Sequence, residues 1–153
     1  MPTNRQLFWL AAVAPLLFVM ALAIRDVATG LWQEKKLGDA AFAGTQWTRA
    51  NSFDQAAITV AARSATDQKG VAVAAANLCG CPSGERIFQF KCDANCTAGN
   101  LSRRYVAVTT SICLDTIVRW PGVRYCSRGD SLCSATGCTP HQVLLSAQSV
   151  ALQ

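Results

Sequence analysis

Residues 7–24 read LFWLAAVAPLLFVMALAI and contain neither a charged nor a strongly polar side chain. An α-helix rises about 1.5 Å per residue, so a run of this length extends over roughly 27 Å, close to the thickness of the hydrocarbon core of a bilayer. Pro15 predicts a mild kink, which membrane helices tolerate because neighbouring turns and helices satisfy the freed carbonyl. The run therefore predicts a transmembrane helix near the N-terminus.

A cleaved signal peptide is the competing interpretation of the same run. Arg5 supplies a short basic region, and Ala21, Leu22 and Ala23 fit the small-x-small pattern before a cleavage site. The apolar run is longer than the ~7 to 15 residues usual in a signal peptide, which favours a retained span. Both interpretations export everything after residue 26.

The position of the cysteines predicts the orientation of the span. All eight cysteines lie between residues 79 and 138, and none precedes them. An oxidising compartment on the C-terminal side favours this distribution, because disulfides persist outside the cytoplasm. The N-terminus is therefore expected in the cytoplasm and the remainder in the periplasm or another extracytoplasmic space.

The 14 Lys and Arg and 9 Asp and Glu are scattered, so the chain has no basic patch typical of nucleic-acid binding.

Beyond the membrane the helical pattern continues, and one helix is predicted over residues 6–49. Its outer part carries small residues that let another helix or a sheet approach closely: Ala40, Ala41, Ala43 and Gly44. A high alanine content with no partner implied is the alternative, and the sequence leaves both open. We expect a partner helix to pack on these four residues.

A second, short helix and a small sheet are expected after residue 50. Ser52 followed by Gln55 resembles a capping box that opens a helix in FDQAAITVAARSAT, and Gln68-Lys69-Gly70 ends it. The stretches VAVAA, RIFQF, YVAVTTSIC and VLLSAQSVAL have the composition of strands. The predicted class is α+β, with a helical region 1–50 and a disulfide-rich α+β domain 51–153 whose sheet is antiparallel.

The cysteines admit three interpretations, namely a zinc site, a redox centre and structural disulfides. Zinc usually takes paired ligands, but Cys79-x-Cys81 is too tight for such a pair, although Cys92-x3-Cys96 and Cys133-x4-Cys138 could be proposed. No thioredoxin-like context surrounds Cys79 and Cys81, which disfavours a redox motif. Structural disulfides fit best, because a small exported domain with an even number of cysteines uses them to hold its loops.

The disulfide candidates are all eight cysteines: Cys79, Cys81, Cys92, Cys96, Cys113, Cys126, Cys133 and Cys138. Eight cysteines allow 105 pairings, so the connectivity cannot be derived from the sequence. Cys79 and Cys81 face nearly the same side of an extended chain, so each is expected to pair with a separate distant cysteine.

No constellation of catalytic residues is visible in the sequence. His141 is the one histidine, and neither Asp115 nor Asp130 can be placed beside it. The chain contains no nucleophile elbow and no glycine-rich phosphate loop. We therefore predict a non-enzymatic protein with no cofactor and no metal.

The order of these features resembles the TadE-like and TadG-like membrane proteins of bacterial tight-adherence (Flp) pilus assembly. The matching stretches cover nearly the whole chain: AVAPLLFVMALAIRDVATGLWQEKKLGDAAFAGTQW, AAITVAARSA, CGCPSG with the later cysteines, YVAVTTS and LSAQSVALQ. The resemblance implies a pseudopilin-like protein of the bacterial inner membrane, anchored by one transmembrane helix, with a small periplasmic domain. It also implies contacts with other pilus assembly or pilin-like subunits.

Processed members of this family carry a Gly at the prepilin-peptidase site and a Glu five residues beyond it. This sequence has no Gly before Gly30 and no acidic residue before Asp26. The resemblance therefore implies an uncleaved, membrane-anchored assembly component instead of a filament subunit. The alternative function is a secreted disulfide-rich binding module or small enzyme, released by signal peptidase after Ala23.

Overall fold

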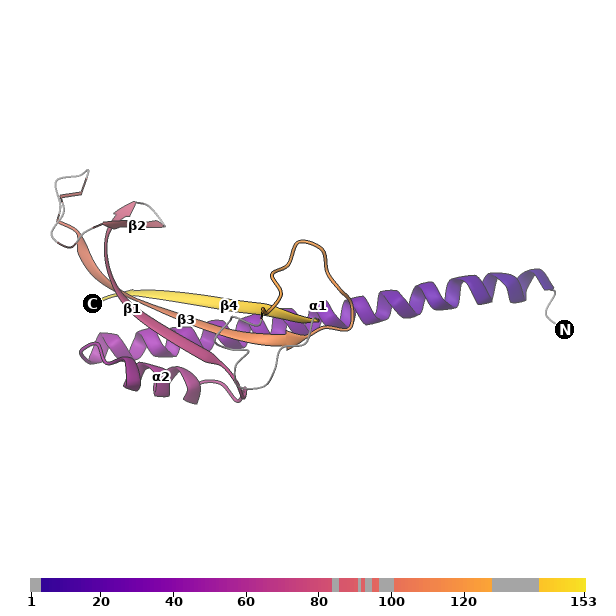
Figure 1. Ribbon diagram of the computed structural model, residues 1–153, viewed down its shortest axis with the longest axis horizontal. Helices are drawn as coiled ribbons and strands as arrows, with labels where there is room; N and C mark the ends of the chain where they lie inside the picture. The colour runs from indigo at the N-terminus through magenta and orange to yellow at the C-terminus, as the bar shows by residue number, and fades with distance from the viewer. Residues whose placement is uncertain (1–3, 84–85, 91, 93–94, 97–100, 128–140) are drawn as a thin grey trace. The chain divides into compact units, whose positions relative to one another are not determined.

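The computed structural model describes residues 4–83, 86–90, 92, 95–96, 101–127 and 141–153. Its elements are α1 (Asn4–Ala50), α2 (Gln55–Ser64), β1 (Ala72–Ser83), β2 (Arg86–Phe90), β3 (Arg103–Asp115) and β4 (Gln142–Leu152) (Figure 1). The predicted α+β class is confirmed: a long apolar N-terminal helix, a short second helix and an antiparallel sheet with disulfides close by.

The chain forms two compact units, each built from two stretches that are distant in sequence. The first unit contains Met1–Gln33 and Cys113–Leu144, and the second contains Glu34–Ile112 and Leu145–Gln153. Helix α1 therefore contributes to both units, and the division within it follows Gln33, whereas the sequence suggested a division after residue 50.

The sheet has the strand order β2-β1-β3-β4. Strand β1 pairs antiparallel with β2 and with β3. Strand β4 also runs antiparallel to β3, because the amide of Thr116 donates to the carbonyl of His141 and the amide of Gln153 donates to the carbonyl of Arg104, over 3.1 Å each. β4 is thus the strand at one edge of the sheet.

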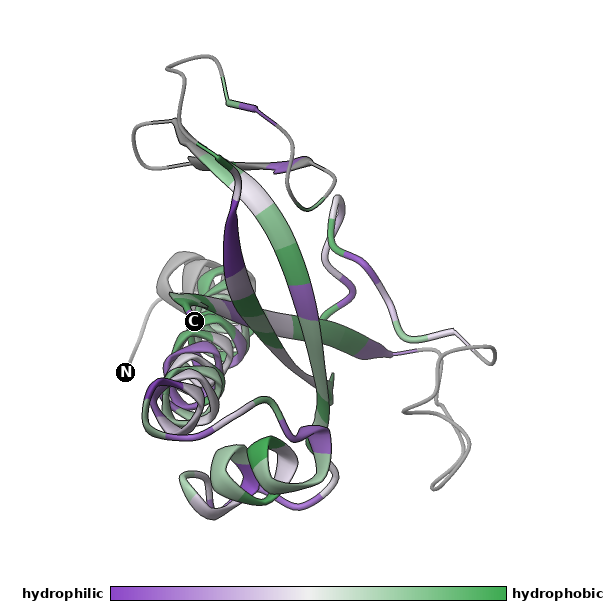
Figure 2. Cartoon of the chain, turned by 90° about the vertical axis from the view of Figure 1, so that its left-hand side faces the viewer, coloured by the Kyte–Doolittle hydropathy of each residue, from purple (hydrophilic) through white to green (hydrophobic). Residues whose placement is uncertain are grey.

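The core of the second unit lies between the sheet, α1 and α2. Its fully buried members are Ala41, Ile58, Val106 and Val108. Figure 2 shows hydrophobic residues along the strands and in α2. Burial of apolar surface of this kind stabilises a fold by about 25 cal/mol per Å² removed from water, so these four positions anchor the unit.

Two hydrogen bonds fasten the sheet to the same part of α1. The hydroxyl of Thr110 on β3 donates to the carbonyl of Leu37 over 2.8 Å. The hydroxyls of Thr45 on α1 and Ser149 on β4 share a hydrogen bond of 3.1 Å. Both threonines are buried, and a buried hydroxyl needs a partner, so these bonds fix the sheet against the helix.

The N-cap of α2 differs from the sequence prediction. Asp54, not Ser52, caps the helix, and its carboxylate accepts from the amides of Ala56 at 2.9 Å and Ala57 at 3.4 Å. Because the first helical residue is Gln55, Ser52 lies too early in the chain and Gln55 cannot reach back as the third residue of a capping box. A negative charge is also favoured at a helix N-terminus, which explains the choice of Asp54.

Candidate functional site

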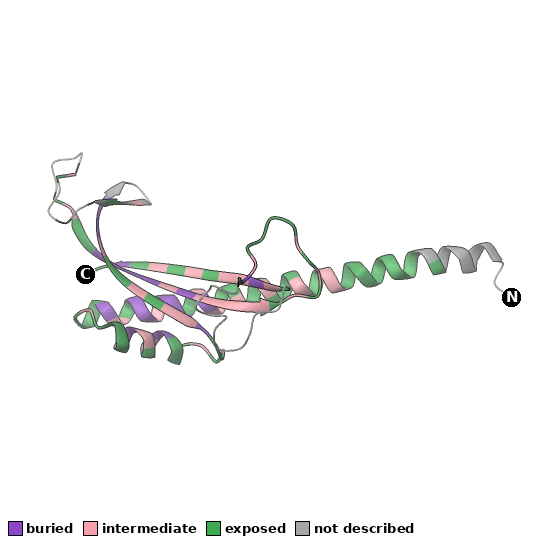
Figure 3. Cartoon of the chain, viewed as in Figure 1, coloured by how far each residue is buried: buried purple, intermediate pink, exposed green. Residues whose placement is uncertain are grey.

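The most exposed apolar surface of the molecule lies on the N-terminal part of α1. We call residues 13–24 the apolar segment. Seven of its large side chains are exposed: Val13, Leu16, Leu17, Phe18, Val19, Met20 and Ile24. Figure 3 shows this part of α1 as exposed and the buried residues of the helix toward its other end. By length and composition the helix could span a membrane, and no part of its most apolar window is buried within the chain.

An apolar surface of this kind requires a cover. Soluble monomers rarely expose contiguous apolar patches larger than about 300 to 600 Å². Because the helix lies near the N-terminus, it could be a membrane span or a signal sequence, the two interpretations that the sequence allows.

A disulfide closes the loop that follows β3. We call residues 113–126 the disulfide loop, after the bond between Cys113 and Cys126. The backbone amides of Ile117 and Val118 both donate to Oδ2 of Asp26 on α1, over 2.9 Å each. Hydrogen bonds to an ionised carboxylate are stronger than neutral ones. The middle of the loop is therefore fastened to α1 directly after the apolar segment.

The C-terminal end of the disulfide loop is held by the start of β4. The amide of Cys126 donates to the carbonyl of Gln142 over 2.8 Å, and the amide of Leu144 donates to the carbonyl of Arg124 over 2.9 Å. These bonds add a short extended stretch to the outer edge of β4, beside the bridge between Tyr125 and Val143.

The interior of the loop is crosslinked as well. The hydroxyl of Tyr125 donates to the carbonyl of Trp120 over 2.8 Å, and the guanidinium of Arg119 lies 5.7 Å from the centre of the Tyr125 ring. At the loop's start, the amide and the hydroxyl of Thr116 both donate to the carbonyl of His141. The loop thus has a defined backbone at its start, middle and end.

A shallow groove of about 350 Å³ lies where the loop meets α1. It is lined by Trp120 and by five residues of α1: Ala23, Ile24, Val27, Ala28 and Leu31. Every lining side chain is apolar or aromatic. Such a groove suits an apolar ligand and offers no polar group for orienting a reaction.

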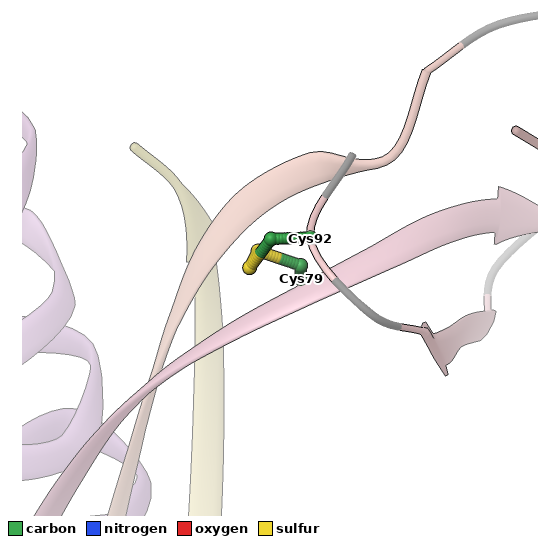
Figure 4. Close-up of a disulfide and its surroundings, with 2 residues drawn as sticks. All are labelled: Cys79 and Cys92. Carbon is green, nitrogen blue, oxygen red and sulfur yellow. A yellow bond between two sulfur atoms is a disulfide. The ribbon is translucent and has the colours of Figure 1, made fainter. Parts of the chain in front are cut away.

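The six described cysteines form disulfides, as the sequence predicted. Besides the loop disulfide, Cys79 pairs with Cys92 (Figure 4) and Cys81 pairs with Cys96. The expectation that Cys79 and Cys81 choose separate partners is confirmed, because both lie on β1 with one residue between them and each bonds a residue beyond β2. The remaining two cysteines, Cys133 and Cys138, lie outside the described residues.

Closing these loops restricts the unfolded chain. The three bonds join residues 13, 15 and 13 positions apart. For loops of this size the chain-entropy model gives about 3 kcal/mol for each bond. No group of three or more metal-binding side chains occurs among the described residues.

The small residues of α1 lie inside the second unit. Ala40 and Ala41 are fully buried, Ala43 is half-buried and Gly44 is buried. A Cβ added at Gly44 would lie 3.0 Å from Cγ1 of Val108 and 3.3 Å from Cγ2 of Ile58. The close approach that the sequence predicted is therefore made by the chain's own sheet and α2. This differs from the expected contact with a partner helix, because no free face remains at Ala40, Ala41 or Gly44.

The outer edge of β4 offers backbone hydrogen-bonding groups instead. In the antiparallel register with β3, odd-numbered residues of β4 bond β3, because Gln153 does so. The even-numbered residues point their amides and carbonyls outward, as Gln142 and Leu144 do toward the disulfide loop. Beyond the loop, Ser146, Gln148, Val150 and Leu152 are exposed. No further described strand covers them.

His141 occupies a structural position at the start of β4. Its carbonyl accepts both bonds from Thr116, and the residue is exposed. Asp115 is exposed at the end of β3, and Asp130 lies outside the described residues. The structure brings no set of catalytic side chains together around His141 within the described residues.

No protein-family model, curated protein or solved structure matches the chain. The resemblance to tight-adherence assembly proteins therefore stays a prediction from the order of sequence features.

Sequence reasoning missed the part played by Asp26. In the sequence it is only the first acidic residue after the apolar run, whereas in the structure its carboxylate accepts from two amides of the disulfide loop. The available signal was a single acidic residue directly after a long apolar run. The partner amides are 91 and 92 positions away, so no local pattern could reveal them.

Proposed function

We propose that this chain is a single-pass protein of the bacterial inner membrane, with its N-terminus in the cytoplasm and its disulfide-bonded part on the extracytoplasmic side. The apolar segment carries the proposal: Leu16, Phe18 and Ile24 are 62%, 66% and 64% exposed. A bilayer removes such side chains from water, and the helix can cross it because its backbone N–H and C=O groups bond one another within the helix.

The disulfides support the extracytoplasmic location. Each of the six described cysteines is bonded, and none of them is free. Disulfides of this kind are rare in the cytoplasm, where thiols are kept reduced. The positions of these cysteines after the apolar segment favour export of the C-terminal part.

We further propose that the protein acts through contacts, as an uncleaved component of a tight-adherence pilus assembly system. The support is the order of features: a proline-containing apolar helix, a small-residue helical continuation, a second helix, cysteines and a C-terminal strand. The outer edge of β4 is the surface expected to bind, and its occupant is an extended strand of a partner subunit. Its stretch Ser146–Leu152 contains no charge and no proline, the residues that usually protect an edge from pairing.

Three measurements test the membrane proposal. Carbonate extraction should leave the protein in the membrane, and N-terminal sequencing should find the uncleaved N-terminal sequence. External protease added to spheroplasts should remove a C-terminal tag and spare an N-terminal one. A soluble species beginning at Ile24 would replace the anchor with the secreted alternative.

A matched pair of variants tests the contact proposal in the source bacterium. Gln148→Lys places a charge on the exposed edge of β4 without removing a bond to β3, and it should reduce cross-linking to partner subunits and the amount of surface pili. His141→Ala keeps the backbone carbonyl that Thr116 uses and should change neither readout. If His141→Ala abolished piliation while Gln148→Lys had no effect, a catalytic or ligand-binding role would replace this proposal.

A further inference from the structure

We propose that the disulfide loop is a second membrane-contacting element, which lies in the headgroup layer of a phospholipid bilayer beside the outer end of the apolar segment. This inference depends on the proposed membrane span. Its partner is the lipid surface, which the loop contacts through Ile117, Trp120 and Val123.

The attachment point sets the depth of the loop. Asp26 lies two residues after Ile24, the last residue of the apolar run, which is about 3 Å further along a helix. The interfacial layer on each side of the hydrocarbon core is roughly 5 to 7 Å thick. The carboxylate of Asp26, and with it the amides of Ile117 and Val118, therefore lies at headgroup depth when the apolar run spans the core.

The exposed side chains of the loop have the composition of an interfacial surface. Ile117 is 52% and Val123 is 41% exposed, although apolar side chains of this size gain from being covered. Arg119 and Arg124 are also exposed. Apolar side chains beside arginines suit a layer in which hydrocarbon and charged phosphates lie within a few ångströms of each other.

Trp120 adds an aromatic anchor. It lines the apolar groove with residues of α1 that extend from Ala23 to Leu31, so it lies beside the end of the apolar run and the turns that follow. Tryptophan is enriched at membrane interfaces because its ring is largely apolar while its N–H is polar. The end of the groove at Ala23 and Ile24, where the apolar run ends, is the place where the upper part of a lipid acyl chain fits.

The crosslinks of the loop prepare it for this contact. The disulfide, the carboxylate of Asp26 and the start of β4 hold its backbone before any lipid is bound. Binding by a preformed surface loses less conformational entropy than binding by a free loop. Interfacial contact therefore needs no folding step.

Lipid quenching of tryptophan fluorescence tests the inference on the full chain in phospholipid vesicles. A variant that keeps Trp120 alone, with the other tryptophans replaced by Phe, should be quenched by lipids brominated near the headgroup and should be shielded from aqueous iodide. Asp26→Ala should detach the middle of the loop, which carries Trp120, from α1 and reduce this quenching, since it removes both hydrogen bonds. Asp39→Ala, at an exposed position of the same helix, should leave it unchanged.

Two further single-tryptophan chains separate the possible failures. A chain that keeps Trp9, inside the apolar run, reports on the span itself, and a chain that keeps Trp47, in the second unit, reports on a position away from lipid. Quenching at Trp9 without quenching at Trp120 would overturn the loop inference and leave the span intact. Absence of quenching at Trp9 would overturn the proposed function first. Quenching at Trp120 that persists in Asp26→Ala would contradict the role of Asp26.

Discussion

The two parts of α1 belong to one continuous helix and differ in burial. Leu31 is 63% exposed, whereas Leu37, six positions later, is completely buried. The first part carries large apolar side chains around its circumference. The second part presents Ala40, Ala41 and Gly44 to the sheet and α2. A helix is therefore buried within the protein where one of its faces lets neighbouring backbones approach closely. Hydrophobicity alone does not provide such a face.

The largest effect is expected from charges placed in the apolar segment. Leu17→Asp combined with Phe18→Asp should prevent stable insertion, because each acidic side chain near the middle of a span costs about 2.5 to 3.5 kcal/mol on insertion scales. Carbonate extraction measures the result. Phe42→Asp is the control, since Phe42 is exposed on the second part of the helix and should leave membrane retention intact. Retention of the double variant would show that the segment does not span.

A leucine pair tests the same contrast in folding stability. Leu37→Ala should destabilise the second unit by about 2 to 5 kcal/mol, the usual cost of truncating a fully buried leucine. Leu31→Ala should change it by less than about 0.5 kcal/mol, as exposed substitutions do. Denaturant unfolding in detergent, followed by the fluorescence of Trp47, measures both. Equal losses would mean that the two positions have similar environments.

A glycine pair should give smaller effects of opposite sign. Gly38→Ala meets no atom within 4 Å and should stabilise the helix by about 0.5 to 1 kcal/mol. Gly44→Ala places a Cβ 3.0 Å from Val108. The overpacking should exceed the helical gain and cost about 1 kcal/mol net. Thermal unfolding of the two variants checks the signs, and stabilisation by Gly44→Ala would contradict the close approach.

The smallest effect concerns the ion pair between Lys36 and Asp67, which joins the second part of α1 to the stretch after α2. The hydrogen bond and charge of Lys36, whose Nζ lies 2.7 Å from Oδ1 of Asp67, hold the pKa of that carboxyl below its ordinary value of 3.8. Because the pKa of Asp67 is lower in the folded state than in the unfolded state, the ion pair stabilises the folded state fully at pH values above the ordinary pKa. This stabilisation is lost as the pH falls through the lower, folded-state pKa.

Asp67→Asn should therefore lower the melting temperature slightly at neutral pH, and the difference from the wild type should close below pH 3.8. The effect is small because Asp67 is exposed and solvent screens the pair. Melting curves across this pH range, at low and high salt, provide the measurement. A difference that grew at acid pH would contradict the assigned sign.

Local patterns predicted most of the elements. The long helix was expected over residues 6–49 and is found at Asn4–Ala50, and RIFQF is β2. These predictions succeeded because apolar runs and turn residues act over a few positions. The N-cap of α2 was placed wrongly, since Ser52 and Asp54 are both capping residues and the difference depends on where the chain enters the helix.

The candidate site was predicted only in part. The apolar run and the disulfide character of Cys79 and Cys81 were readable, because they depend on composition and on alternation along a strand. The attachment of the disulfide loop could not be predicted, since it joins Asp26 to amides that lie 91 and 92 positions away in the chain. The exposed edge at β4 could not be predicted from the sequence either, because the order of all four strands determines which strand lies at an edge.

The sequence by itself determined the apolar helix, the strands and the presence of bonded cysteines, because hydrophobic runs, strand composition and thiol chemistry are local properties. Only the tertiary structure decided which cysteine pairs with which, and that Ala41 and Gly44 pack on the chain's own sheet. It alone connected Asp26 to Ile117. The physical reason is that these contacts join residues far apart in the chain, so they form only when the packing of the whole unit offsets the loss of chain entropy.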